Sequence, residues 1–238
     1  MFQSFIDLIF PRICTGCQQP LQLKEEQICT DCRFELPLTN SHLHVDNKLI
    51  NRFIGKVNLT HALSYLKFVK GGKVQRMMHE LKYKGNQEVG EILGRMYGAD
   101  LKENGFSDEF DLILPVPLHA NRLIIRGYNQ SDSLAKGLSE SLNAPWQNDV
   151  LKRGIETETQ INKSRLERYE NMKDVFFVDK PEGLAEKRIV GMSSLDLRSN
   201  FILEMSISPT VICSFWTTRM VLSQSQKSRC FWPCCSNV

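Results

Sequence analysis

The stretch LPVPLHANRLIIRGYNQSDSLAKGL, Leu114 to Leu138, decides how the chain is organised. Proline lacks the backbone donor that a sheet ladder needs, so a strand that ends in Pro115-Val116-Pro117 must leave the sheet there. The chain then enters a loop that carries Arg122 and Arg126. A helix is predicted to begin near Asn129, because asparagine is a favourable N-cap. A strand end, a basic loop and a helix N-terminus in succession are typical of an anion site in an α/β sheet.

The segments on either side of this stretch alternate between strand and helix patterns. Continuous apolar runs are typical of strands buried in a parallel sheet, whereas apolar residues at three- and four-residue intervals predict helices. Strands are expected at 61–68, 111–116, 175–178 and 188–190, and helices at 74–85, 88–105, 131–142 and 163–171. This alternation predicts an α/β fold with a largely parallel sheet and flanking helices.

Four cysteines near the start form two Cys-x-x-Cys pairs, Cys14 with Cys17 and Cys29 with Cys32, separated by eleven residues. Two residues between cysteines allow a tight knuckle to direct both sulfurs at one ion, and two knuckles complete a tetrahedral four-thiolate shell. The spacing predicts a zinc site without an open coordination position, and therefore a structural one. The alternative is a redox pair or two disulfides. Two nearby histidines are interpreted as surface residues, His42 and His44.

The overall composition is that of an ordinary globular protein. Hydrophobic residues make up 42% of the 238 positions and charged residues 24%, and the formal net charge is +3. This charge is too small to indicate nucleic-acid or membrane binding by itself. The start of the chain, MFQSFIDLIFPR, lacks the basic region and cleavage site of a signal peptide. No window has the ~18 apolar residues of a membrane-spanning helix, so membrane insertion is not expected.

The central stretch resembles a known family, the ComF/GntX proteins. The resemblance is carried by the pattern from Pro-Val-Pro to Arg-Gly-Tyr-Asn-Gln, by the preceding LKYKGN at 81–86, and by the following LKRGIETETQINKSRLERYENMKDVFFV at 151–178. The paired cysteines match the zinc-ribbon head of that family. The resemblance covers roughly residues 10–190. It implies a small zinc-ribbon module followed by a domain similar to type I phosphoribosyltransferases.

The resemblance also implies a ligand. Type I phosphoribosyltransferases bind phosphoribosyl pyrophosphate and displace pyrophosphate from its sugar carbon. In this chain residues 115–126 would form the pyrophosphate loop, with Arg122 and Arg126 as phosphate contacts. Asn129 and Gln130 would orient these arginines.

Two further segments match the family. Lys82 and Tyr83 lie at the end of the helix that precedes the loop, and Lys82 would also contact pyrophosphate. Thr159-Gln160 and residues 165–171 would belong to a segment that covers the site. Simpler structural interpretations stand beside these roles: an ion pair for Arg126, a helix cap for Asn129 and a solvated helix end for Lys82.

One essential motif is missing. Phosphoribosyltransferases place two adjacent acidic residues at a strand end, on the ribose hydroxyls and Mg2+, and follow them with a Thr-Gly turn whose amides hold the 5′-phosphate. The motif is due after the strand that begins near Lys187, where the chain instead reads GMSSLDLRSNFILEMSIS from Gly191. No adjacent acidic pair and no Thr-Gly dipeptide occurs after Glu186. Catalysis, and with it a role for Mg2+ bound with phosphoribosyl pyrophosphate, is therefore not expected of the chain as written.

The composition changes at the same point. Of the 48 residues from 191 to 238, ten are Ser, four are Cys, six are charged, one is Gly and none is Ala. A frameshift near codon 190 is the simplest hypothesis, because the resemblance ends where the motif is due. The competing hypothesis is a divergent tail that binds a second metal through Cys213, Cys230, Cys234 and Cys235, although their spacing fits zinc poorly. As written, the tail is expected to leave the sheet without its last strands.

These features predict four parts: a zinc-ribbon module at 1–36, a connector at 37–60, an incomplete phosphoribosyltransferase-like domain at 61–190 and an atypical tail at 191–238. The resemblance implies a cytoplasmic protein of DNA uptake during bacterial competence, acting beside a helicase and single-stranded DNA. The alternative is a non-catalytic, zinc-dependent module that binds nucleic acid or protein. Basic residues that would contribute to it are Lys152, Arg153, Lys163, Arg165 and Arg168. Glutamates interleaved with them weaken this basic patch.

Overall fold

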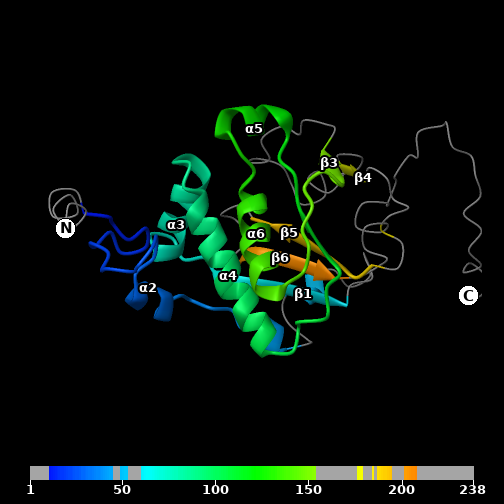
Figure 1. The fold of residues 1–238 in the computed structure, drawn as a ribbon, viewed down its shortest axis with the longest axis horizontal. Coiled ribbons are helices and arrows are strands. Elements are labelled where there is room, and N and C mark those ends of the chain that lie inside the picture. The colour runs from blue at the N-terminus through cyan, green and yellow to red at the C-terminus, as the bar shows by residue number, and fades with distance from the viewer. Residues whose placement is uncertain are drawn as a thin grey trace, which may run out of the picture.

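The computed structural model describes residues 11–44, 49–52, 60–153, 176–178, 184, 187–194 and the backbone of 201–207. Within these residues the chain forms a four-stranded sheet in the order β1-β6-β5-β2 and a two-stranded ribbon, β3-β4 (Figure 1). The strands are β1 His61–Lys67, β2 Leu112–Pro115, β3 Leu151–Arg153, β4 Phe176–Val178, β5 Ile189–Ser193 and β6 Phe201–Ile207.

Three strands of the main sheet run in the same direction. β2 and β5 pair in parallel, with Ile113 opposite Val190, whereas β6 is antiparallel to both of its neighbours, β1 and β5. β1 therefore points the same way as β5 and β2. This confirms the predicted α/β class with a parallel sheet and flanking helices. The antiparallel strand β6 comes from the tail, which was expected to supply none.

Three helices form the main helical layer: α3 Lys73–Tyr83, α4 Gln87–Glu103 and α6 Gln130–Leu142. α4 and α6 lie side by side across the sheet (Figure 1). Their apolar positions recur at helical spacing and are buried in one core with the sheet strands; this core includes Leu93, Tyr97, Leu101, Leu134, Leu138, Ile113 and Val190. Met77 and Met78 of α3 are buried there as well.

The cysteine module shares this core. It contains the short helix α2 Thr30–Phe34, and three of its cysteines belong to the same hydrophobic cluster as Met77 and Leu81. Because the module buries its apolar side chains against α3, it is joined to the main domain by packing as well as by the connector.

The start of the connector, residues 37–39, lies along the outer edge of β1. Thr39 N donates to Tyr65 O at 2.9 Å, and Lys67 N donates to Pro37 O at 2.8 Å. The 3-10 turns η1 Ser41–Leu43 and η2 Ile50–Arg52 follow. This segment covers an edge strand whose backbone groups would otherwise face solvent.

The predicted helices at 74–85, 88–105 and 131–142 are confirmed as α3, α4 and α6, and the strands as β1, β2, β4 and β5, with bounds shifted by a few residues. The helix α5 Ala120–Arg126 and the strand β3 were not predicted. The predicted helix at 163–171 and the first ten residues lie outside the described part of the chain. Among the helices that the structure describes, none has both the length and the apolar character to cross a membrane.

Candidate functional site

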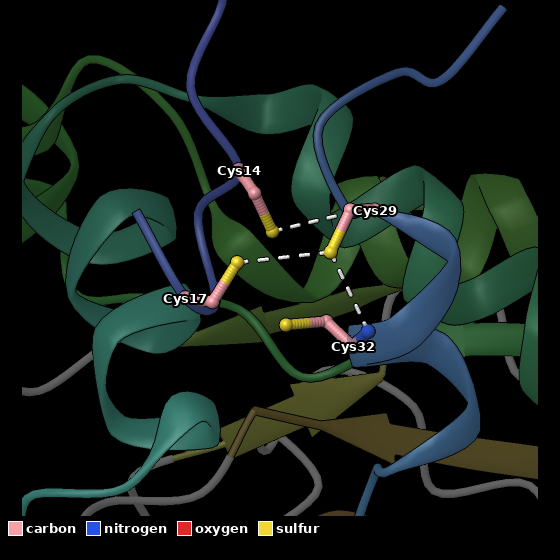
Figure 2. A group of neighbouring side chains, drawn as sticks. All are labelled: Cys14, Cys17, Cys29 and Cys32. Carbon is pink, nitrogen blue, oxygen red and sulfur yellow. Dashed lines mark hydrogen bonds between the residues drawn. The ribbon is translucent and has the colours of Figure 1, made fainter. Parts of the chain in front are cut away.

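The four cysteines of the two knuckles converge on one point (Figure 2). Their sulfur atoms all lie within 4.8 Å of one another, and Cys17 Sγ lies 3.7 Å from Cys29 Sγ. Tetrahedral zinc with Zn–S bonds of about 2.3 Å places its sulfurs about 3.8 Å apart, so the quartet fits such an ion. Cys14 and Cys32 complete the set, and Cys29 is the N-cap of α2. The quartet therefore meets the geometric requirement of a structural, four-coordinate metal site.

Backbone N–H groups point at these sulfurs and favour their ionised form (Figure 2). The N–H groups of Gly16 and Cys29 donate to Cys14 Sγ at 3.4 and 3.3 Å, and that of Cys32 donates to Cys29 Sγ at 3.5 Å. Burial opposes the ionisation of Cys14, yet the backbone donors bring its pKa down to about 7. Burial raises the pKa of Cys29 and of Cys32. A cation among the sulfurs would offset this penalty, because metals bind cysteine as the thiolate.

The two nearby histidines do not join the quartet. His44 is exposed, as predicted. His42 is half-buried, which corrects its interpretation as a surface residue: its ring lies 6.2 Å from the Tyr97 ring, centroid to centroid, and burial lowers its pKa. It therefore belongs to the packing of η1 against α4.

The second candidate site lies where β2 and β5 end side by side. Val116 N donates to Met192 O at 2.7 Å, and Ser194 N donates to the Ser131 hydroxyl at 3.3 Å. Asn129 closes the loop, because its Nδ2 donates to Val116 O at 3.1 Å while its Oδ1 accepts from Ser131 N at 3.3 Å as the N-cap of α6. The ends of a parallel strand pair and a helix N-terminus thus meet, as in the anion sites of α/β proteins.

Two contacts hold Arg126 beside the start of α6. Its Nη1 donates to Gln130 Oε1 at 2.7 Å, and its guanidinium carbon lies 5.6 Å from the centroid of the Tyr83 ring at the end of α3. Because Gln130 Oε1 accepts this bond, Nε2 is the amide atom left to donate. Gln130 is fully buried, and its Nε2 has no hydrogen-bond partner within the described residues. A buried, unpaired donor beside a guanidinium suits an anionic ligand.

The other predicted phosphate contacts lie differently. Arg122 is exposed on α5, a short helix in what the sequence indicated as a loop. Lys82 is buried, with 6% of its surface exposed, next to Tyr83 in α3. The structure thus brings Arg126, Asn129 and Gln130 together and leaves Arg122 in solvent.

Two residues of the site had no predicted role. The hydroxyl of Tyr128 donates to the carbonyl of Leu81, which ties the turn before α6 to α3. The available signal was its place inside Gly-Tyr-Asn-Gln. Asp132 lies in the first turn of α6, where burial raises its pKa although the Asn129 and Asn148 amides donate to it at 2.6 and 3.2 Å. When ionised, it offsets part of the positive end of the helix dipole.

The acidic pair of phosphoribosyltransferases is due where β5 ends. The residues described there, Ser193 and Ser194, carry no carboxylate, and 195–200 lie outside the described residues. Other predicted residues also fall outside them, namely Thr159, Gln160, Lys163, Arg165, Arg168, Cys213, Cys230, Cys234 and Cys235.

Comparison with known proteins finds named relatives. The chain is 28% identical over 194 residues to the DNA utilization protein YhgH of Escherichia coli O157:H7, a match that covers 73% of this chain and 81% of that protein. It is 29% identical over 167 residues to Competence protein F of Haemophilus influenzae, over 69% of each chain. No family profile and no solved structure matches the chain. The named relatives confirm the resemblance to the ComF family.

Proposed function

We propose that this ComF-like protein serves DNA uptake and utilization, and that it binds phosphoribosyl pyrophosphate, or a nucleotide-like ligand of the same chemistry, through the pyrophosphate group. The names of the relatives, which refer to competence and to DNA utilization, support the setting. The motif from Pro115 to Gln130 supports the ligand class. In this setting the protein would act in the cytoplasm beside a helicase and single-stranded DNA, with structural zinc in its cysteine quartet.

The observation that carries the ligand class is the pairing of Arg126 with Gln130. A guanidinium offers phosphate two parallel donors, and the unpaired Nε2 of Gln130 would add a third from a buried position. The first amides of α6 add the positive end of a thirteen-residue helix. Arg122 would contribute long-range attraction from α5, and Lys82 would contribute positive charge from its buried position in α3.

We propose further that the chain as written binds this ligand without turning it over. The acidic pair and the Thr-Gly turn that would hold Mg2+, ribose and the 5′-phosphate are absent from the sequence after Glu186, where the family places them. A frameshift near codon 190 accounts for this absence. Sequencing the gene from codon 180 tests it: an acidic pair followed by a Thr-Gly turn in another frame would make the intact protein a candidate phosphoribosyltransferase. If no frame contains them, the frameshift hypothesis fails.

Calorimetric titration of the full chain with pyrophosphate and with phosphoribosyl pyrophosphate tests the binding site. Arg126→Ala should weaken binding by about tenfold or more, because a charge-assisted hydrogen bond contributes about 1.5–3 kcal/mol. Gln130→Leu should weaken it several-fold, and Arg122→Ala less than Arg126→Ala. Lys102→Ala, at the opposite end of α4, is the control for lost positive charge. Equal affinity of the wild type and Arg126→Ala for pyrophosphate would contradict the proposed site. Release of pyrophosphate from phosphoribosyl pyrophosphate by the purified chain would contradict the proposed lack of turnover.

A second function has a specific observation in its favour. Three large apolar side chains of the cysteine module are exposed, Ile13, Leu23 and Phe34, by 54%, 83% and 86%. Exposed aromatic and aliphatic residues on a metal-stapled module suit binding to protein or to unstacked bases. Of the basic residues considered for this role, Arg153 lies over the Phe176 ring at 5.3 Å. Fluorescence anisotropy of a labelled single-stranded oligonucleotide, measured at two salt concentrations, separates the two functions. Salt-dependent binding by the wild type that is lost in Phe34→Ala would favour the binding module.

A further inference from the structure

The first cysteine knuckle packs directly against α3. The carbonyl of Gly16, which lies between Cys14 and Cys17, accepts a hydrogen bond from Arg76 Nε at 2.6 Å. A Cβ added at Gly16 would lie 2.6 Å from Met77 Cε and 2.9 Å from Cys32 Sγ. The knuckle and the helix therefore have no free space between them. A displacement of the sulfurs must displace side chains of α3, because close-packed contacts transmit strain.

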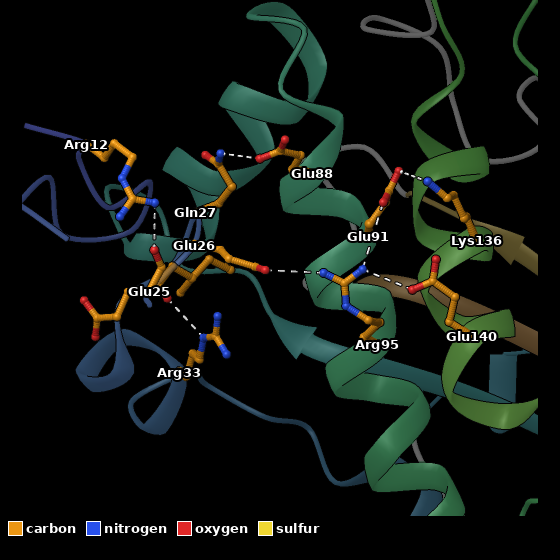
Figure 3. Close-up of polar contacts among 11 residues, drawn as sticks. Arg12, Glu25, Glu26, Gln27, Arg33, Glu88, Glu91, Arg95, Lys136 and Glu140 are labelled. Carbon is orange, nitrogen blue, oxygen red and sulfur yellow. Dashed lines mark hydrogen bonds and ion pairs between the residues drawn. The ribbon is translucent and has the colours of Figure 1, made fainter. Parts of the chain in front are cut away.

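Two residues that flank the second knuckle, Gln27 and Glu35, make polar contacts near the two ends of α3. Lys73, the first residue of α3, forms an ion pair with Glu35. Beyond the other end, Asn86 Nδ2 donates to Gln27 Oε1 at 2.7 Å. Figure 3 shows the next bond, in which Gln27 Nε2 donates to Glu88 at 2.6 Å. The position of α3 along its own axis is thus tied to the cysteine module.

An ion network extends from the same module over α4 to α6 (Figure 3). Glu26 lies 3.5 Å from Arg95, which reaches Glu140 at 3.1 Å, and Lys136 pairs with Glu91 at 2.8 Å. These groups are partly or largely exposed, so each pair contributes little stability. The network nevertheless connects the module to both helices.

The opposite end of α3 forms part of the anion site. Leu81 O accepts the hydroxyl of Tyr128, two residues before Gln130, and the Tyr83 ring lies beside the Arg126 guanidinium. The end of α3 thus contacts the turn from which Arg126 and Gln130 make their hydrogen bond. One helix of eleven residues thus packs against the first cysteine knuckle through Met77 and against the guanidinium through Tyr83, its last residue.

We propose that occupancy of the metal site controls the affinity of the Arg126 loop for its anion, with α3 as the connecting element. This inference rests on the proposed function, because it concerns the regulation of the same site. A bound ion would hold the four sulfurs around one point and would thereby keep Gly16 packed against Met77. When the ion is removed, the knuckles lose the interaction that holds them together, since metal binding supplies folding free energy to such modules. The end of α3 then loses its fixed position, and Tyr83 and Tyr128 cease to hold Arg126 in place.

Titration with inorganic pyrophosphate tests the coupling in the full chain, once loaded with zinc and once stripped by a chelator under reducing conditions. Stripping should weaken binding at least fivefold, the lower range of allosteric coupling, and should speed amide hydrogen exchange at 73–83 and 120–130. Equal affinity and equal exchange in a stripped chain that keeps its circular dichroism would overturn the inference. A loaded chain that binds no pyrophosphate would contradict the proposed function instead, and the exchange measurement alone would then decide the coupling.

Met77→Ala provides a second test that leaves all four cysteines in place. It should retain one zinc per chain, bind pyrophosphate more weakly than the wild type when loaded, and lose part of the difference between the loaded and stripped states. Met96→Ala, which removes a methionine of α4 that packs against the same core, is the matched control and should keep the wild-type difference. If the stripped wild type unfolds, the loaded Met77→Ala chain decides: an affinity equal to that of Met96→Ala would overturn the inference.

Discussion

Gly94 of α4 and Gly137 of α6 meet backbone to backbone. A Cβ on Gly94 would lie 2.3 Å from Leu134 O and 3.1 Å from Gly137 Cα, and a Cβ on Gly137 would lie 2.0 Å from Glu91 O. Gly90 and Gly98 extend the same small face of α4 by one turn on each side. This contact sets the distance between α4, which meets the cysteine module through Glu26 and Gln27, and α6, whose N-terminus forms the anion site.

Alanine at the centre of this contact should be strongly destabilising. Gly94→Ala should lower the free energy of unfolding by about 2 kcal/mol, because overpacking against backbone atoms costs about 3 kcal/mol, the upper end of its usual range, and outweighs the gain of about 1 kcal/mol in helix propensity. Urea denaturation provides the measurement. Wild-type stability of Gly94→Ala would mean that the two helices do not meet in this way.

The neighbouring turn offers a rescue experiment. A Cβ on Gly98 would meet the side chain of Ser141, whose Cβ lies 2.6 Å away. Gly98→Ala should therefore destabilise the chain, and adding Ser141→Gly should restore part of the loss because the obstructing atom is removed. Adding Ser141→Gly to Gly94→Ala should restore no stability, since a Cβ at Gly94 would meet backbone atoms and not Ser141. Purely additive effects at Gly98 and Ser141 would contradict the contact.

Asp111 should make stability depend on pH in the acid range. It accepts from Arg188 N, Nε and Nη2 at 2.7, 3.1 and 2.8 Å, and these bonds bring its pKa down to about 2. A carboxyl whose pKa is lower in the folded state stabilises the fold above its unfolded pKa of about 3.9, and that contribution is lost as pH falls through about 4 toward 2. Asp111→Asn should cost about 0.5–1 kcal/mol at pH 7, since the pair is partly exposed. The difference from wild type should shrink as pH falls toward 2 and vanish below it; a difference of full size below pH 2 would exclude the charge as its origin.

The sequence was sufficient for those parts of the fold that repeat a pattern. The apolar spacing in α4 and the run Leu112–Pro115 predicted their elements because burial of one face is periodic. The short helix α5 buries no residue, so it leaves no periodic signal, and a loop was predicted in its place. β6 was missed for another reason. It lies only a few residues after β5 and also pairs with β1, far back in the sequence, but the changed composition of 191–238 indicated that this segment supplies no strand.

The two candidate sites also differ in how far the sequence alone predicts them. The cysteine quartet is local, because two knuckles of fixed spacing must bring four sulfurs together once they share an ion, and the prediction of these residues needed no tertiary information. The contacts of Arg126 are not local. Its position depends on Tyr83 of α3, and no spacing rule connects the two residues. Resemblance to a family named both segments, but only the fold places the ring beside the guanidinium.

Metal analysis should find one zinc per chain. Cys32→Ser removes a fully buried member of the quartet, so the chain should lose most of its zinc and unfold at a markedly lower temperature. Cys213→Ser is the matched control and should change neither the zinc content nor the melting temperature. Two zinc ions per chain, one of them lost in Cys213→Ser, would instead support a second site in the tail.

The strand β6 makes the tail testable as part of the fold. Met205 of β6 lies opposite Leu63 of β1 on one side and opposite Met192 of β5 on the other. A proline at this position therefore removes a ladder hydrogen bond from an interior strand. Met205→Pro should lower the free energy of unfolding by about 3 kcal/mol or more. Truncation after residue 200 should destabilise the chain similarly, whereas truncation after residue 208 keeps every described strand and serves as the control. If Met205→Pro and the shorter truncation both leave stability unchanged, β6 is not part of the sheet, and β1 and β5 lack the strand that joins them in the chain as written.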